Sequence, residues 1–203
     1  MTNNYLVMMA KQPRCGAVKS RLAADLGSVA ATSIYRTMMY NSIARLSRDP
    51  RWQFVLSLTP ESTLNEPLWP QYIPLIGQGR GGLGERMQRI MDEMPPGKVI
   101  IIGSDIAGMR PDHTAQAFKK LGTADAVFSP VSDGGYSLVG MKRTPRILSI
   151  FDHVRWSSEH TLKDTVRNLA GLKTVYVEEM ADIDTGADWN NWKRTHKTGR
   201  LCL

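Results

Sequence analysis

Three aspartates in two distant parts of the chain have the chemistry expected of a cation site. Asp105 follows the apolar segment 98–103, and Asp182 and Asp184 flank Ile183 near the carboxyl end. A carboxylate at the carboxyl end of a buried parallel strand points into the crevice where open α/β sheets bind ligands. Magnesium is usually held by one or two protein carboxylates, while substrate phosphates and water complete its coordination. The three aspartates therefore predict a divalent cation bound together with a phosphorylated substrate.

The acidic loop also has a simpler explanation, because it precedes a predicted helix. Thr185 and Asp188 have the spacing of a helix cap, and Asp184 lies where it would face the positive end of that helix. A cap requires one acid, however, and two like charges one residue apart repel each other unless a positive group lies near them. The sequence leaves capping and cation binding as alternatives.

A basic loop over residues 11–22 is the predicted nucleotide-phosphate site. Gly16 allows backbone amides to approach an anion closely, and the loop leads into a predicted helix whose dipole attracts anions. Its positive side chains are Lys11, Lys19 and Arg21. The loop is not a Walker A motif, because Val18 stands where that motif needs glycine. A solvated basic turn is the alternative.

Two further glycine-containing segments are candidate substrate contacts. Residues 77–84 contain a formal G-x-G-x-x-G match, but the strand before it is short and contains Pro74. We expect a loop over the ligand in which Arg86 contacts the substrate, with a flexible connection as the alternative. The second segment, residues 129–136, is predicted to form a tight turn or a substrate cradle. Its candidate residues are Asp133, Gly134, Gly135 and Tyr136.

Composition limits the class of protein. The 203 residues fit one globular domain, 1–203, and a net charge of +7 favours an anionic partner. No nucleic-acid-binding motif and no apolar run of membrane-spanning length occur, so a phosphorylated small molecule is the expected partner. Two cysteines provide neither a disulfide framework nor a zinc site. The amino end lacks the pattern of a signal peptide, so a cytoplasmic protein is expected.

Strand-like and helix-like segments alternate almost throughout, which predicts an α/β fold with a mainly parallel mixed sheet flanked by helices. The run 98–103 has no polar alternation and should be the central strand. The other expected strands are 5–9, 52–58, 72–76, 126–128, 137–140 and 174–177. The expected helices follow Lys19 and Gly27, span 83–94, 111–121 and 157–169, and begin again at Ala187.

Six ordered segments resemble a bacterial glycosyltransferase-like family whose members are described as nucleotide-diphospho-sugar transferases. They are Lys11-x-Pro-x-x-Gly-x-Val-Lys-Ser-Arg-Leu22, Gly82-Leu-Gly-Glu-Arg-Met87, Ile102-Gly-Ser-Asp105, Pro130-x-x-Asp-Gly-Gly-Tyr136, Trp156-Ser-Ser158 and Asp182-Ile-Asp-Thr185. The family is similar to the molybdenum-cofactor nucleotidyltransferases and to the guanylyltransferases that act on phospholactate. The resemblance implies a single-domain, Rossmann-like GT-A fold.

The resemblance also implies roles for particular residues. Gly16, Lys19 and Arg21 would bind nucleotide phosphates, and the turn 133–136 would face the donor or acceptor. Asp105, Asp182 and Asp184 would bind Mg²⁺ or Mn²⁺, with Asp105 and Lys19 as catalytic residues. Four positions depart from the family pattern. Ser20 replaces threonine, Gly82 replaces aspartate, and Ile106-Ala107 replaces Cys-Pro.

The expected function is a metal-dependent transferase acting on a nucleotide or nucleotide-diphospho-sugar and on a small-molecule acceptor. Glycosyl transfer and nucleotidyl transfer both fit these residues, because each depends mainly on placement and charge stabilisation. One alternative is a nucleotide-binding protein that has the fold but has lost turnover, which the changes at Gly82, Ile106 and Ala107 motivate. A dinucleotide-binding oxidoreductase is a more distant alternative.

Overall fold

The computed structural model describes residues 3–143, 148–180 and 182–195. Its centre is a seven-stranded sheet with the order β3-β2-β1-β4-β6-β5-β7. The strands are β1 (Asn4–Lys11), β2 (Gln53–Thr59), β3 (Leu75–Gly77), β4 (Lys98–Gly103), β5 (Ala126–Pro130), β6 (Tyr136–Lys142) and β7 (Thr174–Tyr176). β6 pairs antiparallel with both of its neighbours, and the other pairs are parallel. The predicted mixed, mainly parallel sheet is confirmed.

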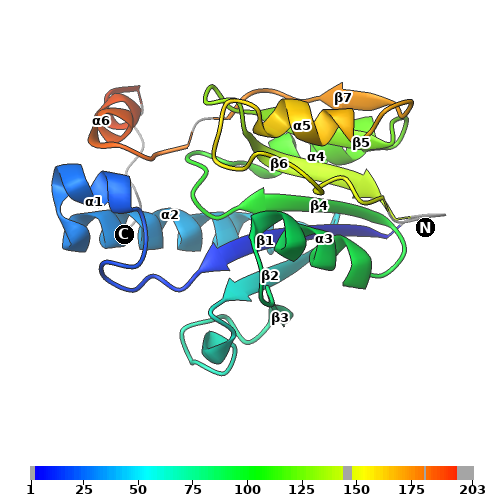
Figure 1. The fold of residues 1–203 in the computed structure, drawn as a ribbon. Helices are drawn as coiled ribbons and strands as arrows, with labels where there is room; N and C mark the ends of the chain where they lie inside the picture. Colours follow the sequence, from blue (N-terminus) through cyan, green and yellow to red (C-terminus); the bar gives the residue numbers. More distant parts are fainter. Residues whose placement is uncertain (1–2, 144–147, 181, 196–203) are drawn as a thin grey trace.

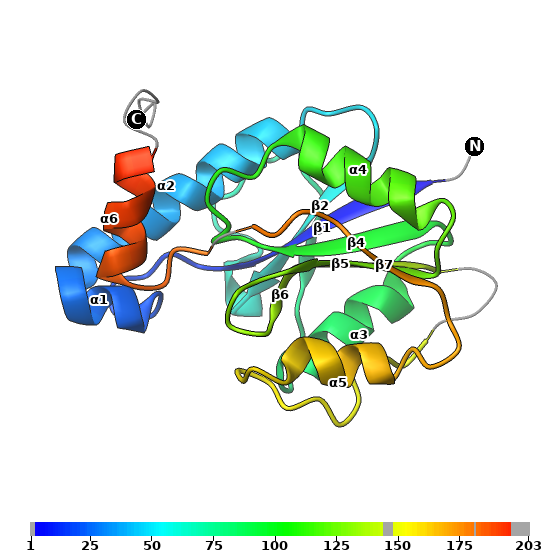
Figure 2. The same ribbon diagram turned by 90° about the horizontal axis from the view of Figure 1, so that it is seen from above.

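Helices cover both faces of the sheet (Figures 1 and 2). They are α1 (Ser20–Leu26), α2 (Ser28–Leu46), α3 (Leu83–Glu93), α4 (Pro111–Leu121), α5 (Thr161–Arg167) and α6 (Gly186–Thr195). α2 and α4 pack on one face, and α3 and α5 pack on the other. α1 and α6 lie together at one end of α2, where buried Leu22 and Ile183 share a small cluster. Among the residues described, no helix is long and apolar enough to cross a membrane.

The central position of β4 explains its uninterrupted apolar sequence. Val99 and Ile101 belong to the core layer under α3 and α5, whereas Ile100 and Ile102 belong to the layer under α2 and α4. All four are at most 2% exposed. A strand covered on both faces has no solvent side that would favour polar residues. β4 ends at Gly103 in the middle of the sheet, and Ser104 and Asp105 follow at its carboxyl end.

Two elements begin three or four residues later than the sequence predicts. The strand expected over 72–76 begins only at Leu75. Proline lacks a backbone donor, so Pro74 contributes only its carbonyl, which accepts from Leu56 N at 3.0 Å. The helix expected from Ser157 begins at Thr161. Ser157 has a left-handed backbone with φ of 56°, which a right-handed helix does not accommodate.

Candidate functional site

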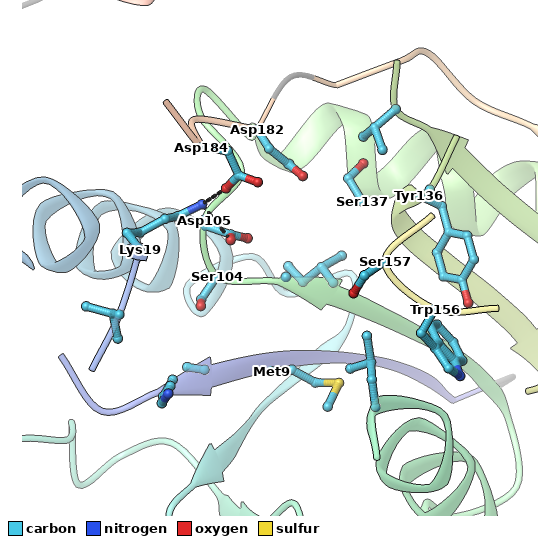
Figure 3. A pocket seen from close by; sticks show the side chains of 18 of the residues that line it. Met9, Lys19, Ser104, Asp105, Tyr136, Ser137, Trp156, Ser157, Asp182 and Asp184 are labelled. Carbon is cyan, nitrogen blue, oxygen red and sulfur yellow. Dashed lines mark hydrogen bonds and ion pairs between the residues drawn. The ribbon is translucent and has the colours of Figure 1, made fainter. Parts of the chain in front are cut away.

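A cleft of about 670 Å³ opens where the carboxyl ends of β1 and β4 meet the start of β6. Figure 3 shows two groups of side chains on opposite sides of it. Lys19, Asp105, Asp182 and Asp184 form one group, and Tyr136, Trp156 and Ser157 belong to the other. The cleft thus lies at the strand ends where parallel α/β sheets place ligands.

Lys19 is the centre of the charged group. Its Nζ lies 2.8 Å from Asp105 Oδ2 and 2.6 Å from Asp184 Oδ1, and its side chain is 6% exposed. Burial on its own would lower the pKa of Lys19, but the two carboxylates outweigh this effect and raise the pKa above its ordinary value. Lys19 is therefore a fixed ammonium that joins the first loop to both acidic segments.

Backbone geometry places Lys19 in this position. It is the residue before α1 and has a left-handed backbone, with φ of 50° and ψ of 53°. Such a conformation is unfavourable for a residue with a Cβ, by roughly 1–2 kcal/mol. The two ion pairs offset that cost. The local sequence around Lys19 gives no sign of the conformation, because glycine and asparagine are the usual residues there.

Asp182 lies beside this cluster and has a different environment. Its backbone forms an isolated bridge with Ile106, which brings the acidic loop against the segment after β4. Among the described residues, its buried Oδ1 atom has no hydrogen-bond partner. Burial and the charge of Asp105 raise the pKa of Asp182 to about 7, against the opposing effect of Lys19. A buried carboxylate oxygen without a partner fits a cation ligand.

The three predicted metal ligands thus lie on one side of the cleft, with Lys19 between two of them. Within the described parts of the chain, no group of three or more Asp, Glu, His or Cys side chains forms a ready-made metal site. The donor set still suits Mg²⁺ or Mn²⁺, because hard cations prefer carboxylate oxygens and Asp182 offers one without a partner. The metal role of these aspartates stays a prediction.

The predicted helix cap is present, and its carboxylate belongs to Asp188 rather than to one of the three predicted metal ligands. Asp188 Oδ2 accepts hydrogen bonds from Thr185 N at 2.8 Å, Thr185 Oγ1 at 2.7 Å and Asp184 N at 3.2 Å. The carboxylate of Asp184 is not used in this cap and faces Lys19 instead. Capping and charge clustering therefore coexist in the loop, on separate side chains.

The structure places part of the first loop in the cleft wall, but not Arg21. Lys11 and Gly16 line the cleft with Lys19. Gly16 has φ of 76°, a value that favours glycine. Arg21 does not line the cleft. Its guanidinium is 3.7 Å from Asp184 Oδ2 with a side chain 72% exposed, which places Arg21 at the outer rim.

The other predicted contacts divide into two groups. Asp133, Gly135 and Tyr136 line the cleft, whereas Gly134 and Arg86 do not. Gly134 has φ of 84°, and a Cβ on it would overlap the backbone of Glu159. Arg86 donates to the Gly81 carbonyl at 2.8 Å and to Gln78 Oε1 at 3.5 Å. Gly134 therefore packs against Glu159 and Arg86 holds the second glycine loop, and neither residue lines the cleft.

The second glycine loop is braced by side chains. Gly79 N donates to Glu61 Oε1 at 2.9 Å, and Arg89 donates to the Gln78 carbonyl at 2.6 Å. The loop follows β3, which is an edge strand of three residues. The sheet order also differs from the 3-2-1-4-5-6 order of dinucleotide-binding domains. We therefore do not interpret the G-x-G-x-x-G match as a dinucleotide-binding site.

Several cleft residues had no predicted role. Tyr35 of α2 donates to the Lys11 carbonyl at 2.9 Å, accepts from Lys11 N at 3.0 Å, and lies 2.9 Å from Ser104 Oγ. Burial raises the pKa of the Tyr35 hydroxyl. Its helical spacing indicates only a core residue, so the sequence has no signal for this role. Trp156, Ser157 and Ser158 also line the cleft. The sequence signal for these three residues is the segment Trp156-Ser-Ser158, which is one of the six that resemble the family.

Residues 42–158 match a family described as "Uncharacterized protein conserved in bacteria (DUF2064)". The match covers more than half of the chain, and the chain belongs to this family. No curated protein sequence matches it.

Solved structures show the same fold. A Desulfovibrio desulfuricans G20 protein, provisionally described as a nucleotide-diphospho-sugar transferase, is 27% identical with a TM-score of 0.88, over 99% of this chain and 90% of that one. The 4-diphosphocytidyl-2C-methyl-D-erythritol synthase of Anaerococcus prevotii is 8% identical with a TM-score of 0.60, over 97% and 99% of the two chains. Rv0371c of Mycobacterium tuberculosis H37Rv, in complex with manganese, is 15% identical with a TM-score of 0.53, over 94% and 97%. The predicted GT-A-like fold is confirmed.

Proposed function

We propose that this member of the bacterial family is a transferase that acts on a nucleotide or a nucleotide-diphospho-sugar. The observation that carries the proposal is the buried Lys19 ammonium between Asp105 and Asp184, at the carboxyl edge of the sheet and beside the Gly16 loop. A fixed cation beside a glycine turn suits the charge and shape of a diphosphate. The similarity to the Desulfovibrio protein supports the same class of donor.

In this proposal, the first loop positions the phosphates. Gly16 brings backbone close to them, and Lys19 exchanges a carboxylate partner for a phosphate oxygen. Lys11 adds a second positive charge on the same side of the cleft. These residues bind and orient the leaving group, and no side chain has to act as a nucleophile.

The three aspartates would hold Mg²⁺ or Mn²⁺. Such a cation, when bound, neutralises diphosphate charge as the leaving group departs. The manganese complex of Rv0371c supports this choice of metal at the level of the shared fold. Asp182 is the residue best suited to attract the cation, because its Oδ1 atom is buried without a partner among the described residues.

Two reactions fit this arrangement. In glycosyl transfer, the oxygen of an acceptor hydroxyl forms a bond to the anomeric carbon and loses its proton to solvent, while the bond from that carbon to the β-phosphate oxygen breaks and the nucleoside diphosphate leaves. In nucleotidyl transfer, an acceptor phosphate oxygen attacks the α-phosphorus and pyrophosphate leaves. Incubation with radiolabelled nucleoside triphosphates and sugar nucleotides, followed by product analysis, separates the two. Absence of transfer from every donor would refute the proposed enzyme.

A nucleotide-binding protein without turnover is the second candidate. It is favoured by the position of Lys19, which fills the space between two predicted metal ligands. Calorimetry with nucleotides, with and without Mn²⁺, tests binding apart from catalysis. We expect Asp105→Asn to weaken manganese-dependent binding by more than about tenfold, because even outer-shell changes weaken metal sites by about that factor. The exposed Asp92→Asn is the matched control, and equal binding by both variants would remove Asp105 from the site.

A further inference from the structure

The end of the cleft farthest from the charged cluster has a distinct character. Its walls are largely apolar and come from α3, β6 and the loop before α5. They are formed by Leu83, Met87, Tyr136, Val139 and Trp156. Among the described residues that line the cleft, the only cationic side chains are Lys11 and Lys19, and both belong to the first-loop end. The far end therefore lacks the positive charge that an anionic group requires.

Nearby cations are engaged elsewhere. Arg155 donates to both carboxylate oxygens of Asp164, at 2.8 and 2.9 Å, and Arg86 binds the glycine loop. Asp133 also lines the cleft, where its negative charge would repel a carboxylate or phosphate. Asp133 Oδ1 accepts from Gly135 N at 2.9 Å, which holds the carboxylate in place. Away from the first loop, the charges that line the cleft thus disfavour an anionic ligand.

Hydroxyl groups supply the polar contacts at the far end. Ser137, Ser157, Ser158 and Thr161 line the cleft. The hydroxyls of Ser137, Ser158 and Thr161 already donate to backbone carbonyls. The Ser157 hydroxyl points toward the interior of the cleft (Figure 3). Within the described residues it has no intramolecular hydrogen-bond partner. Ser157 also has a left-handed φ of 56°, and strained residues of this kind cluster at functional sites.

The wall that carries Ser157 is held firmly. Asp164, whose side chain is 1% exposed, accepts from the Arg155 backbone at 3.1 Å as well as from its guanidinium. Trp156 packs edge-on against Tyr136 with ring centroids 6.4 Å apart. A Cβ at Gly84 would come within 2.8 Å of the Trp156 ring, so the start of α3 lies directly against it. The apolar wall and its hydroxyls are therefore preformed.

From this geometry we infer that the far end binds an uncharged sugar ring. Ring carbons fit the apolar walls, ring hydroxyls match the serine and aspartate groups, and a carboxylate or phosphate would have no cation to pair with. The inference rests on the proposed function and specifies its substrate: the group next to the nucleotide is a neutral sugar rather than an acidic one. Ser157 and Trp156 are the specificity-determining residues.

Matched ligand pairs test the inference by calorimetry with Mn²⁺. The probes are UDP, UDP-glucose and UDP-glucuronate, and GDP, GDP-mannose and GDP-mannuronate. We expect a neutral sugar nucleotide to bind at least about tenfold more tightly than its uronate, since a charge without a partner is costly to bury. If the nucleotides bind and the uronates bind equally or more tightly, the inference is overturned while the proposed function stands.

Variants locate the discrimination. Glycine at position 157 adopts a positive φ without strain. We expect Ser157→Gly to weaken binding of the neutral sugar nucleotide about three- to tenfold, as loss of one hydrogen bond does. Trp156→Leu should weaken this binding by a similar factor, and both variants should bind the nucleoside diphosphate with the affinity of the wild type. Tyr72→Leu, an exposed aromatic outside the cleft, is the control. Unchanged affinity in both cleft variants would overturn the assignment.

Free sugars separate the two proposals. Saturation-transfer NMR with glucose and mannose, compared with glucuronate and mannuronate, probes the far end without any nucleotide. If no nucleotide binds but the neutral sugars do, the proposed donor class fails and the neutral subsite stands. If the uronates give the stronger signal, or if no sugar binds in either form, the inference fails.

Discussion

The ammonium of Lys19 donates a 2.6 Å hydrogen bond to Asp184, a residue 165 positions later in the chain. The same ammonium lies 2.8 Å from Asp105. Lys19 thereby acts as an internal counter-ion, because it balances carboxylates that would otherwise repel each other. In the proposed function, a divalent cation replaces Lys19 as the partner of the carboxylates, and a nucleotide phosphate replaces a carboxylate as the partner of Lys19. Cation binding and nucleotide binding should therefore be coupled through this side chain.

Lys19→Met tests this coupling directly. Without nucleotide, we expect Mn²⁺ affinity to rise by about tenfold, because a competing charge only a few ångströms away has been removed. Nucleotide affinity should fall by about the same factor, because a cationic phosphate contact is lost. Electron paramagnetic resonance of free Mn²⁺ and calorimetry measure the two effects. Lys11→Met is the control, since it removes a cleft cation outside the aspartate cluster; equal Mn²⁺ affinity in all three proteins would contradict the counter-ion role.

Tyr35→Phe tests the support of the first loop. Removal of the hydroxyl takes a hydrogen-bond partner from the part-buried Lys11 backbone groups and from buried Ser104, which should cost about 1–3 kcal/mol in the free energy of unfolding. Nucleotide affinity should also fall, because Lys11 begins the loop. Urea denaturation and calorimetry measure the two changes. Tyr40→Phe on the same helix removes a hydroxyl that donates to Leu68 away from the cleft, and it should lower stability without changing nucleotide affinity.

Local patterns predicted most of the fold. The apolar run 98–103 and the helix 111–121 have the predicted bounds in the structure. A strand buried on both faces shows no alternation, and a proline at the first helical position fixes where the helix begins. The antiparallel direction of β6 is consistent with the glycine turn that precedes it. These signals are local, so the sequence carries them.

The features that the sequence did not reveal depend on distant contacts. Asp105, Asp182 and Asp184 were predicted as a group, but the ammonium between two of them depends on the left-handed backbone of Lys19. The late start of α5 likewise depends on Arg155 and Asp164, whose pairing stabilises a turn in place of a first helical turn. The hydrophobic periodicity of a sequence does not reveal which side chains pair in the folded structure.

Asp164→Asn tests the clamp behind the apolar wall. Hydrogen bonds from Arg155, with its positive charge and that of Arg167, hold the pKa of Asp164 well below its ordinary value despite burial. A depressed pKa stabilises the folded state above the unfolded value of about 3.9, and this stability is lost as pH falls through the folded value. The variant should thus unfold at a lower temperature than the wild type at pH 7, with a difference that narrows below about pH 4.

Circular dichroism during heating between pH 7 and pH 3 measures this difference. Tryptophan fluorescence supplies a second readout, because a loosened 155–158 loop exposes the Trp156 indole to water; the same measurement on Trp156→Leu isolates this residue among the five tryptophans. Asp112→Asn is the control, since that carboxylate is 86% exposed and its ion pair with Arg51 is 3.4 Å long. A constant difference between wild type and Asp164→Asn over the whole pH range would show that the carboxylate charge does not stabilise the fold.

Gly134→Ala tests whether the turn between β5 and β6 is shaped by packing as well as by backbone conformation. Gly134 and Gly171 have nearly the same φ, 84° and 82°, but a Cβ at Gly134 would overlap the Glu159 backbone, whereas a Cβ at Gly171 meets nothing within 4 Å. Gly171→Ala should therefore lose only the conformational term, about 1 kcal/mol. Gly134→Ala should lose about 3 kcal/mol, because overpacking adds to that term. The Gly134 carbonyl also accepts from Leu162 N at 2.9 Å, so the same change should shift the loop that carries Ser157. Urea denaturation of the two variants measures the difference, and equal losses would mean that the contact with Glu159 relaxes without cost.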